Sequence, residues 1–264
     1  MMELLHLLNL NGKVAIVTGA SGALGAASAR ALVSVGAKVI LVSRDCDKLC
    51  PLVKEFGSRS AVMEGDVSLI GEADRIVERV ADEYGRVDIL VNAAGGASVG
   101  GLMDLDDETW QANLDLKLLG YMRMMRAAAR VMRRLGGGKI INIIGLAGHE
   151  PYHLLTAPSV VDAGLLALTK SAADELASDN ILVNAVNPNA AETRLGGHMI
   201  EELAKAQGVT SQNAHCSLVG STPLKRLARS DDVAASVLFY ATDLSAFITG
   251  TSMTIDGGAH RAIA

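Results

Sequence analysis

The sequence lacks an excess of positive charge, long apolar runs and a paired set of cysteines. Its 24 basic and 29 acidic side chains give a net charge of −5, so there is no basic footprint for nucleic acid and we expect no such partner. No apolar run reaches the roughly 20 residues that a membrane-spanning helix needs. Three cysteines without metal-type spacing to histidine indicate reduced thiols and no metal site.

The beginning of the chain also lacks the marks of a secretory signal. Glu3 stands where a signal peptide would carry basic residues, and no small-residue cleavage site follows the leucine-rich segment 4–10. We therefore expect a cytoplasmic protein that makes no contact with a membrane.

The overall composition is that of a globular protein. Hydrophobic residues make up 50% of the chain and charged residues 20%, and 264 residues are enough to bury a sizeable core. Internal repeats and low-complexity linkers are missing from the sequence. We therefore expect one domain over residues 1–264.

Short apolar runs alternate with helical patterns along the whole chain. The runs typical of strands are 14–18, 39–42, 61–63, 89–91, 140–144, 181–186 and 252–255. The helical patterns are 23–35, 47–56, 72–84, 107–135, 160–177 and 231–241. Because the strands are too continuously apolar to have a wet face, the pattern predicts an α/β fold with a doubly wound parallel sheet of the Rossmann type, in three α/β/α layers.

A glycine-rich stretch follows the first strand. Gly19, Gly22 and Gly25 lie between the apolar run Val14–Thr18 and the alanine-rich helical segment 26–35. A strand, a tight turn and a helix N-terminus in this order form a site that can hold a phosphate group. The stretch therefore predicts a nucleotide cofactor site.

Polar residues also follow the other strands of the predicted sheet. They are Ser43–Arg44, Asp66–Val67, Asn92–Gly95, and Asn187–Asn189 with Thr193 beyond. Together with the glycine stretch and the closing Gly250–Gly258, this set resembles the short-chain dehydrogenase/reductase family over essentially the whole chain. The resemblance implies an NAD(P)(H)-dependent oxidoreductase.

The resemblance also implies which residues contact the cofactor. The pyrophosphate role falls on Gly19, Ser21, Leu24 and Gly25, the adenine role on Asp66 and Val67, and the ribose role on Asn92, Ala93 and Gly95, with Pro188 and Thr193 completing the site. Two positions depart from the family pattern. Ala23 replaces the middle glycine, where its methyl group would crowd the phosphate, and Ala93 replaces a second asparagine.

The end of the second strand favours NADP(H) over NAD(H). An NAD site usually offers a carboxylate to the adenine ribose there, whereas this chain has Ser43 and Arg44. A hydroxyl and a guanidinium suit a 2′-phosphate through charge-assisted hydrogen bonds. Asp45 beside them weakens the positive field.

All four catalytic positions of the family are substituted. Alignment places Lys117 at the family's asparagine, Gly145 at its serine, Pro158 at its tyrosine and Asp162 at its lysine. We hypothesise that Lys117 and Asp162 form a buried ion pair beneath the nicotinamide position.

Replacement acids are available in the loop after the fifth strand. Tyr152 has the chemistry of the family's tyrosine, and His153 carries an imidazole, a common acid/base group in catalysis. The candidate catalytic residues are therefore Lys117, Asp162, Tyr152 and His153.

The segment at about 187–230 is irregular in pattern, with one short helix near 199–206. A long segment over the expected ligand edge predicts a substrate lid. Its apolar residues favour an apolar or cyclic small molecule as substrate.

Three functions remain open. The first is an NADP(H)-dependent oxidoreductase that acts on a carbonyl or alcohol with a non-standard catalytic site. The others are a catalytically silent cofactor-binding subunit with an active paralogue, and a non-redox lyase or isomerase on the same scaffold. By resemblance, the helices 107–135 and 160–177 would form the interface of a homo-oligomer, a dimer or homotetramer, or of a hetero-oligomer.

Overall fold

A single parallel sheet forms the centre of the molecule. The computed structural model describes residues 6–96 and 98–261. Seven strands are arranged in the order β3-β2-β1-β4-β5-β6-β7, and every neighbouring pair is parallel. The strand order reverses direction between β1 and β4, which makes the sheet doubly wound and confirms the predicted fold class.

The strands lie where the apolar runs predict them, with shifts of at most two residues at their ends. Their bounds are β1 Val14–Thr18, β2 Lys38–Ser43, β3 Ser60–Glu64, β4 Ile89–Asn92, β5 Gly138–Ile143, β6 Ile181–Pro188 and β7 Ser252–Ile255. All residues of β1 and β4 are buried, because helices cover both faces of the sheet.

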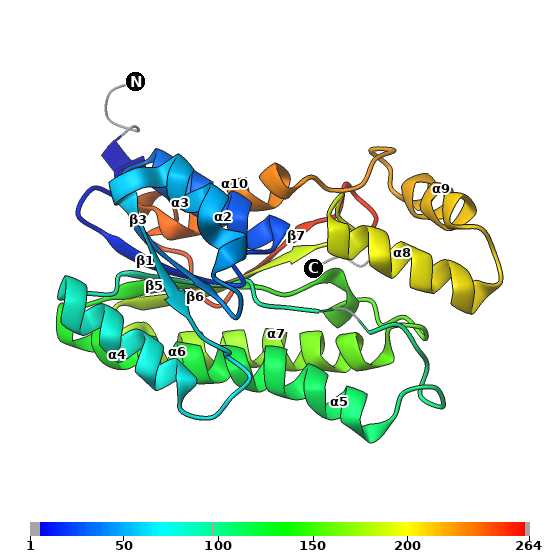
Figure 1. Cartoon of the computed structure of the whole chain (residues 1–264), viewed down its shortest axis with the longest axis horizontal. Helices are drawn as coiled ribbons and strands as arrows, with labels where there is room; N and C mark the ends of the chain where they lie inside the picture. Colours follow the sequence, from blue (N-terminus) through cyan, green and yellow to red (C-terminus); the bar gives the residue numbers. More distant parts are fainter. Residues whose placement is uncertain (1–5, 97, 262–264) are drawn as a thin grey trace.

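The helices form two layers (Figure 1). On one face, α2 (Ala23–Ser34), α3 (Cys50–Phe56) and α10 (Ser230–Ala241) pack around Leu32, Leu52 and Val237. On the other face, α4 (Glu72–Tyr84), α6 (Gly120–Leu135) and α7 (Thr156–Leu176) pack around Ile76, Met124 and Leu165. Because all the strands are parallel, their carboxyl ends lie along one edge of the sheet, and the turns from strand to helix lie there too.

The long predicted helix 107–135 is not a uniform α-helix. It consists of α5 (Asp107–Asn113), a π-helical segment η4 (Leu114–Leu119) and α6. The helix predicted at 160–177 begins earlier, at Thr156, because Pro158 falls in its first turn, where a missing N–H group breaks no helical bond. The π segment turns Lys117 towards β5 and α7, as described below.

The prediction that segment 187–230 is mostly irregular is wrong. It contains α8 (Arg194–Gln207) and α9 (Ser211–Ser221), which extend from one end of the sheet (Figure 1). Thr193 caps α8 by accepting a hydrogen bond from the Gly196 N–H group, and the two helices pack around a small core of their own, including Ile200 and Ala214. The predicted short helix 199–206 is the second half of α8.

The remaining elements are short 3-10 helical turns. The turns are η1 His6–Leu8, η2 Asp47–Leu49, η3 Gly57–Arg59, η5 Leu146–Gly148, η6 Ala177–Asp179 and η7 Asp243–Ser245.

All three cysteines are free thiols. Within residues 6–96 and 98–261, the helices are too short or too polar to cross a bilayer. Glu3, on which the signal-peptide argument depends, lies outside the described residues.

Candidate active site

A cavity of about 710 Å³ lies at the carboxyl ends of β1, β2, β3 and β4. Ten of the predicted cofactor residues line it, namely Gly19, Ser21, Leu24, Ser43, Arg44, Asp66, Val67, Ala93, Gly95 and Thr193. Lys48 and Arg194 also line it and were missed by sequence reasoning, although each lies close in the chain to a predicted residue. Gly25, Asn92 and Pro188 are absent from the lining.

The glycine turn has the close backbone packing of a phosphate cradle. Gly19 has a φ angle of 63°, and a Cβ atom there would lie 2.6 Å from the Ala93 carbonyl oxygen. A Cβ atom on Gly25 would collide with the Gly19 carbonyl oxygen, which explains why Gly25 shapes the turn without reaching the cavity. Gly22 caps α2 without a side-chain bond, so the first N–H groups of α2 remain free for an anion. The cradle therefore fits a dinucleotide pyrophosphate.

The far end of this cavity carries two cations. The Ser43 and Ser21 hydroxyls are 3.0 Å apart, and Arg44 follows Ser43 in the lining. Lys48 Nζ lies 2.8 Å from Asp45 Oδ2, and its hydrogen bond holds the pKa of Asp45 below the usual value. Lys48 thus offsets the charge of Asp45, and Arg44 remains as a cation with no ion-pair partner among the described residues.

Asn92 does not line the cavity, and its side chain instead contacts a neighbouring strand. It is fully buried at the end of β4, and its Nδ2 donates to Asn142 Oδ1 on β5 over 2.9 Å. Its Oδ1 atom is buried and finds no hydrogen-bond partner in the described part of the chain. The side chain therefore ties β4 to β5 behind the cofactor cavity.

Three of the four substituted catalytic positions, Lys117, Gly145 and Asp162, form one connected cluster. Lys117 Nζ lies 2.6 Å from Asp162 Oδ1 and donates to the Ile144 carbonyl oxygen over 2.8 Å. The side chains of Lys117 and Asp162 are only 15% and 5% exposed. The predicted ion pair is therefore present, and it ties the π segment to α7 and to the end of β5. Neither side chain lines the cofactor cavity.

Gly145 is part of the same cluster for a steric reason. A Cβ atom on Gly145 would lie 2.5 Å from Asp162 Oδ2, so the family's serine position has no room for a side chain beside this carboxylate. Tyr121 lies nearby, but it is fully buried and donates to the Ile143 carbonyl oxygen over 3.0 Å. Burial and the Asp162 charge raise the pKa of Tyr121 well above its usual value, so Tyr121 keeps its proton.

A second cavity, of about 440 Å³, lies beneath α8 and α9. Ten of its sixteen lining residues are apolar, with Leu146, Leu155, Met199, Leu203 and Leu218 among them. The other six are Glu150, Tyr152, Asn189, Gln207, Ser217 and Ser221. Tyr152 lines it, and its hydroxyl oxygen accepts a hydrogen bond from Gln207 Nε2 over 2.9 Å. His153 packs edge-on against Tyr152 and lies outside the lining. Gln207, at the last residue of α8, carried no signal in the sequence that would have singled it out.

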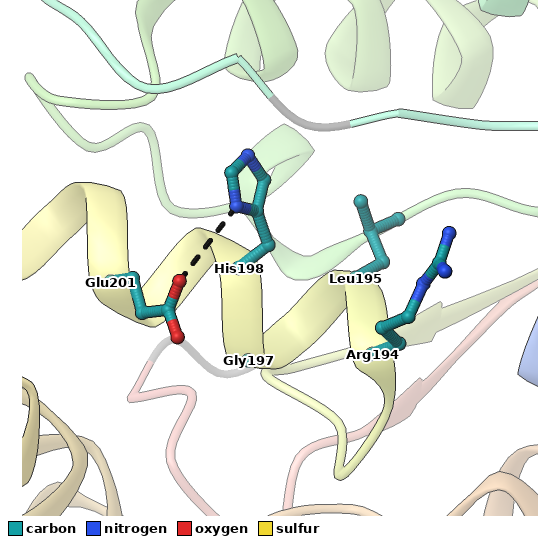
Figure 2. A pocket seen from close by; sticks show the side chains of 5 residues that line it. All are labelled: Arg194, Leu195, Gly197, His198 and Glu201. Atoms are coloured by element: carbon teal, nitrogen blue, oxygen red, sulfur yellow. Dashed lines mark ion pairs between the residues drawn. The ribbon is translucent and has the colours of Figure 1, made fainter.

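Helix α8 connects the two cavities. Its first residues, Arg194 and Leu195, line the cofactor cavity, whereas Met199, Leu203 and Gln207 line the apolar one. Arg194, Leu195 and His198 project from one side of the helix and border an open hollow of about 650 Å³ (Figure 2). His198 Nδ1 lies 3.9 Å from Glu201 Oε2. Helix α8 is therefore placed to respond to ligands in both cavities.

Over residues 6–96 and 98–261, no three His, Cys, Asp or Glu side chains come together in a way that could hold a metal ion.

The family model described as enoyl-(acyl carrier protein) reductase matches residues 19–260. The chain therefore belongs to the short-chain dehydrogenase/reductase family of NAD(P)-dependent oxidoreductases. This confirms the family resemblance found in the sequence and agrees with the dinucleotide cradle at the sheet edge.

Individual relatives span the same length as this chain. A 3-oxoacyl-(acyl-carrier-protein) reductase of Synechocystis sp. is 34% identical over 254 residues, which cover 94% of this chain and 97% of that protein. A galactitol 2-dehydrogenase of Agrobacterium fabrum is 31% identical over 252 residues, covering 95% and 98%. The crystal structure of an NAD⁺-bound xylitol dehydrogenase has a TM-score of 0.89 at 27% identity, covering 94% of this chain and 99% of that one.

Proposed function

We propose that this protein is an NADP(H)-dependent oxidoreductase that acts on a carbonyl or alcohol group of an apolar or cyclic small molecule. The observation that carries the proposal is the pair of cavities joined by α8, one built as a dinucleotide cradle and one mainly apolar. A cofactor held at the sheet edge and a substrate held under the same helix are the two reactants of a hydride transfer.

The preference for NADP(H) is supported by the charges at the adenosine end. The Arg44 guanidinium is available to a 2′-phosphate, and the Ser43 and Ser21 hydroxyls are hydrogen-bond partners beside it. Lys48 offsets the nearby Asp45 carboxylate, which would otherwise repel the phosphate. The carboxylate that an NAD site usually offers at the end of this strand is replaced by Ser43.

Tyr152 is the residue we assign to proton transfer. Its side chain is 37% exposed and lines the apolar cavity, where a substrate would lie. Because the phenol oxygen accepts a hydrogen bond from Gln207, its own hydrogen is free to be donated to a substrate oxygen. The bound nicotinamide would supply the hydride, and Tyr152 would supply the proton to the carbonyl oxygen.

The Lys117–Asp162 pair has a supporting role in this proposal. Its two charges cancel, and both Lys117 donor contacts lie within the protein. The pair therefore fixes the loop after β5, from which Tyr152 extends, and contributes no net charge to the substrate cavity.

The test is NADPH oxidation with a panel of cyclic ketones, comparing the wild-type protein with Tyr152→Phe. We expect Tyr152→Phe to lower kcat by about a hundredfold, the usual contribution of a positioned acid, while the NADPH dissociation constant stays unchanged. Tyr84→Phe is the matched control, because Tyr84 contacts Glu83 at the surface of the opposite part of the sheet. Equal turnover by Tyr152→Phe and the wild-type protein would remove Tyr152 from the reaction.

A second candidate function is a cofactor-binding subunit without catalysis of its own. The observation that favours it is the loss of all four family catalytic side chains at Lys117, Gly145, Pro158 and Asp162, with the resulting charges locked in an internal ion pair. NADPH binding without turnover of any ketone, followed by activity when a catalytic paralogue is added, would support this function over the first.

A further inference from the structure

A single charged side chain stands in the wall of the apolar cavity. Among the described residues that line this cavity, Glu150 is the only Asp, Glu, Lys, Arg or His. It borders the space under α8 and α9. Its side chain is 41% exposed, so the carboxylate remains accessible to a small ligand. A charge in this position affects which ligands can enter the cavity.

Only one oxygen atom of the Glu150 carboxylate is hydrogen-bonded by the described residues. Its Oε1 atom accepts hydrogen bonds from His260 Nδ1 over 2.7 Å and from the Arg261 N–H group over 3.0 Å. The backbone N–H group of His260 donates to Asp256 Oδ2, and the His260 ring centroid lies 5.6 Å from that of His149. The other oxygen, Oε2, makes no hydrogen bond to any described residue, and so it can accept one from a ligand.

The segment after β7 is therefore part of the cavity. Ala259 lines the cavity directly, and the next two residues fix Glu150. The hydrogen bond from the Arg261 N–H group has the largest effect on the pKa of Glu150 and lowers it. Desolvation raises this pKa, and the His260 hydrogen bond lowers it again, so it stays below its usual value. The carboxylate thus stays ionised at neutral pH.

We propose that Glu150 is a specificity-determining residue that selects substrates with a hydroxyl or ammonium group next to an apolar body and disfavours carboxylates. An ammonium or hydroxyl group donates to Oε2, whereas a carboxylate would place two negative charges together in a partly desolvated cavity. This inference rests on the proposed function only in taking the apolar cavity as the substrate site.

The test measures binding, so it does not depend on turnover. The probes are adamantylamine, adamantanol and adamantanecarboxylate, which share one rigid apolar body and differ in charge. Their dissociation constants are measured by ligand-observed NMR titration at pH 7. We expect the wild-type protein to bind the amine roughly five- to tenfold more tightly than the carboxylate, as a half-exposed ion pair allows.

Three variants sharpen the result. Glu150→Gln keeps the shape and an acceptor oxygen but removes the charge, and it should bring the amine and carboxylate to within about twofold. Glu150→Asp should keep the order of the preference. Glu201→Gln, on the side of α8 shown in Figure 2, removes a carboxylate outside the cavity and should change nothing.

Two outcomes would overturn the inference. One is equal binding of the amine and carboxylate by the wild-type protein, and the other is a preference that persists in Glu150→Gln. Selective binding without any ketone reduction would instead support the role of Glu150 while contradicting the proposed oxidoreductase function, so the two failures are distinguishable.

Discussion

The two halves of the ligand edge differ in how they relate to the family. At the ends of β1 to β4, the glycine turn and the strand-end residues form a cavity that fits a dinucleotide. After β5, in the π segment and along α7, the positions aligned with the family's catalytic residues hold an ion pair, a glycine and a proline. On the alignment with the family, the cofactor cavity is retained, and the positions expected to carry proton transfer hold other side chains.

The difference teaches that the substitutions depend on one another. Asp162 offsets the charge of Lys117, and Gly145 leaves space for Asp162 Oδ2. A buried lysine without the carboxylate, or a serine beside it, would each be unfavourable alone. Lys117, Gly145 and Asp162 thus form one repacked unit.

The largest effect should come from breaking the ion pair. Asp162→Leu leaves the Lys117 ammonium buried without its carboxylate, and we expect a loss of about 3–5 kcal/mol in the free energy of unfolding. The double variant Lys117→Met/Asp162→Leu replaces both charges by apolar groups and should recover most of that loss. Urea unfolding followed by circular dichroism measures both values.

The double variant also separates stability from catalysis. If the pair only supports the loop after β5, the double variant should keep NADPH binding and most of its kcat. A stable double variant without any kcat would show that Lys117 or Asp162 takes part in the reaction itself.

The next effect concerns Gly145. Gly145→Ser should lower the free energy of unfolding by about 2 kcal/mol, because the new Cβ atom meets Asp162 Oδ2. The same substitution in a Lys117→Met/Asp162→Ala background should cost much less, since the carboxylate is gone. Gly220→Ser is the control, because a Cβ atom there meets nothing within 4 Å. Equal costs in both backgrounds would contradict the steric explanation.

Much of the fold and of the cofactor half could be predicted from the sequence. Continuous apolar runs define the strands, and the residues after each strand must meet at one edge of a parallel sheet. The charges of Lys117 and Asp162 also predicted their contact, because the alignment placed them at facing positions. These features depend on periodicity and on topology, both of which are encoded locally.

Other features depend on packing that local patterns do not reveal. The π segment Leu114–Leu119 consists of leucine, aspartate and lysine, and no residue in it signals a departure from an α-helix. Gly196, Gly197 and Gly208 made the segment of α8 resemble a loop in the sequence, although the first two lie inside the helix and the third follows it directly. The contact between Gln207 and Tyr152 joins residues 55 positions apart and follows only from how α8 packs.

A smaller effect tests the cofactor half by itself. Arg44→Gln removes the unpaired cation and should weaken NADPH binding about tenfold, the value of one charge-assisted hydrogen bond, while NADH binding changes less than about twofold. Fluorescence titration gives both dissociation constants. Arg59→Gln serves as the control, because Arg59 contacts the Val33 carbonyl oxygen outside the cavity. Tighter binding of NADH than of NADPH by the wild-type protein would contradict the NADP(H) preference.

The smallest effect concerns the ion pair between Arg226 and Asp232 at the start of α10. The chain returns from α9 to α10 through Arg226, whose guanidinium pairs with Asp232, and Asp232 also accepts from the Arg229 N–H group over 2.8 Å. These bonds lower the pKa of Asp232 from 3.8 to about 2. Asp232→Asn should therefore lower the free energy of unfolding by about 1 kcal/mol at neutral pH, a value reduced by solvent screening.

The sign of the pH dependence follows from the lowered pKa of Asp232. The unfolded chain takes up the proton near pH 3.8 and the folded chain only near pH 2, so the stabilisation is complete above the first value and is lost as the pH falls towards the second. The difference in unfolding free energy between wild type and Asp232→Asn should thus be smaller at pH 3 than at pH 7 in urea titrations. A difference independent of pH would mean that Asp232 acts through the shape of its cap on α10 and not through its charge.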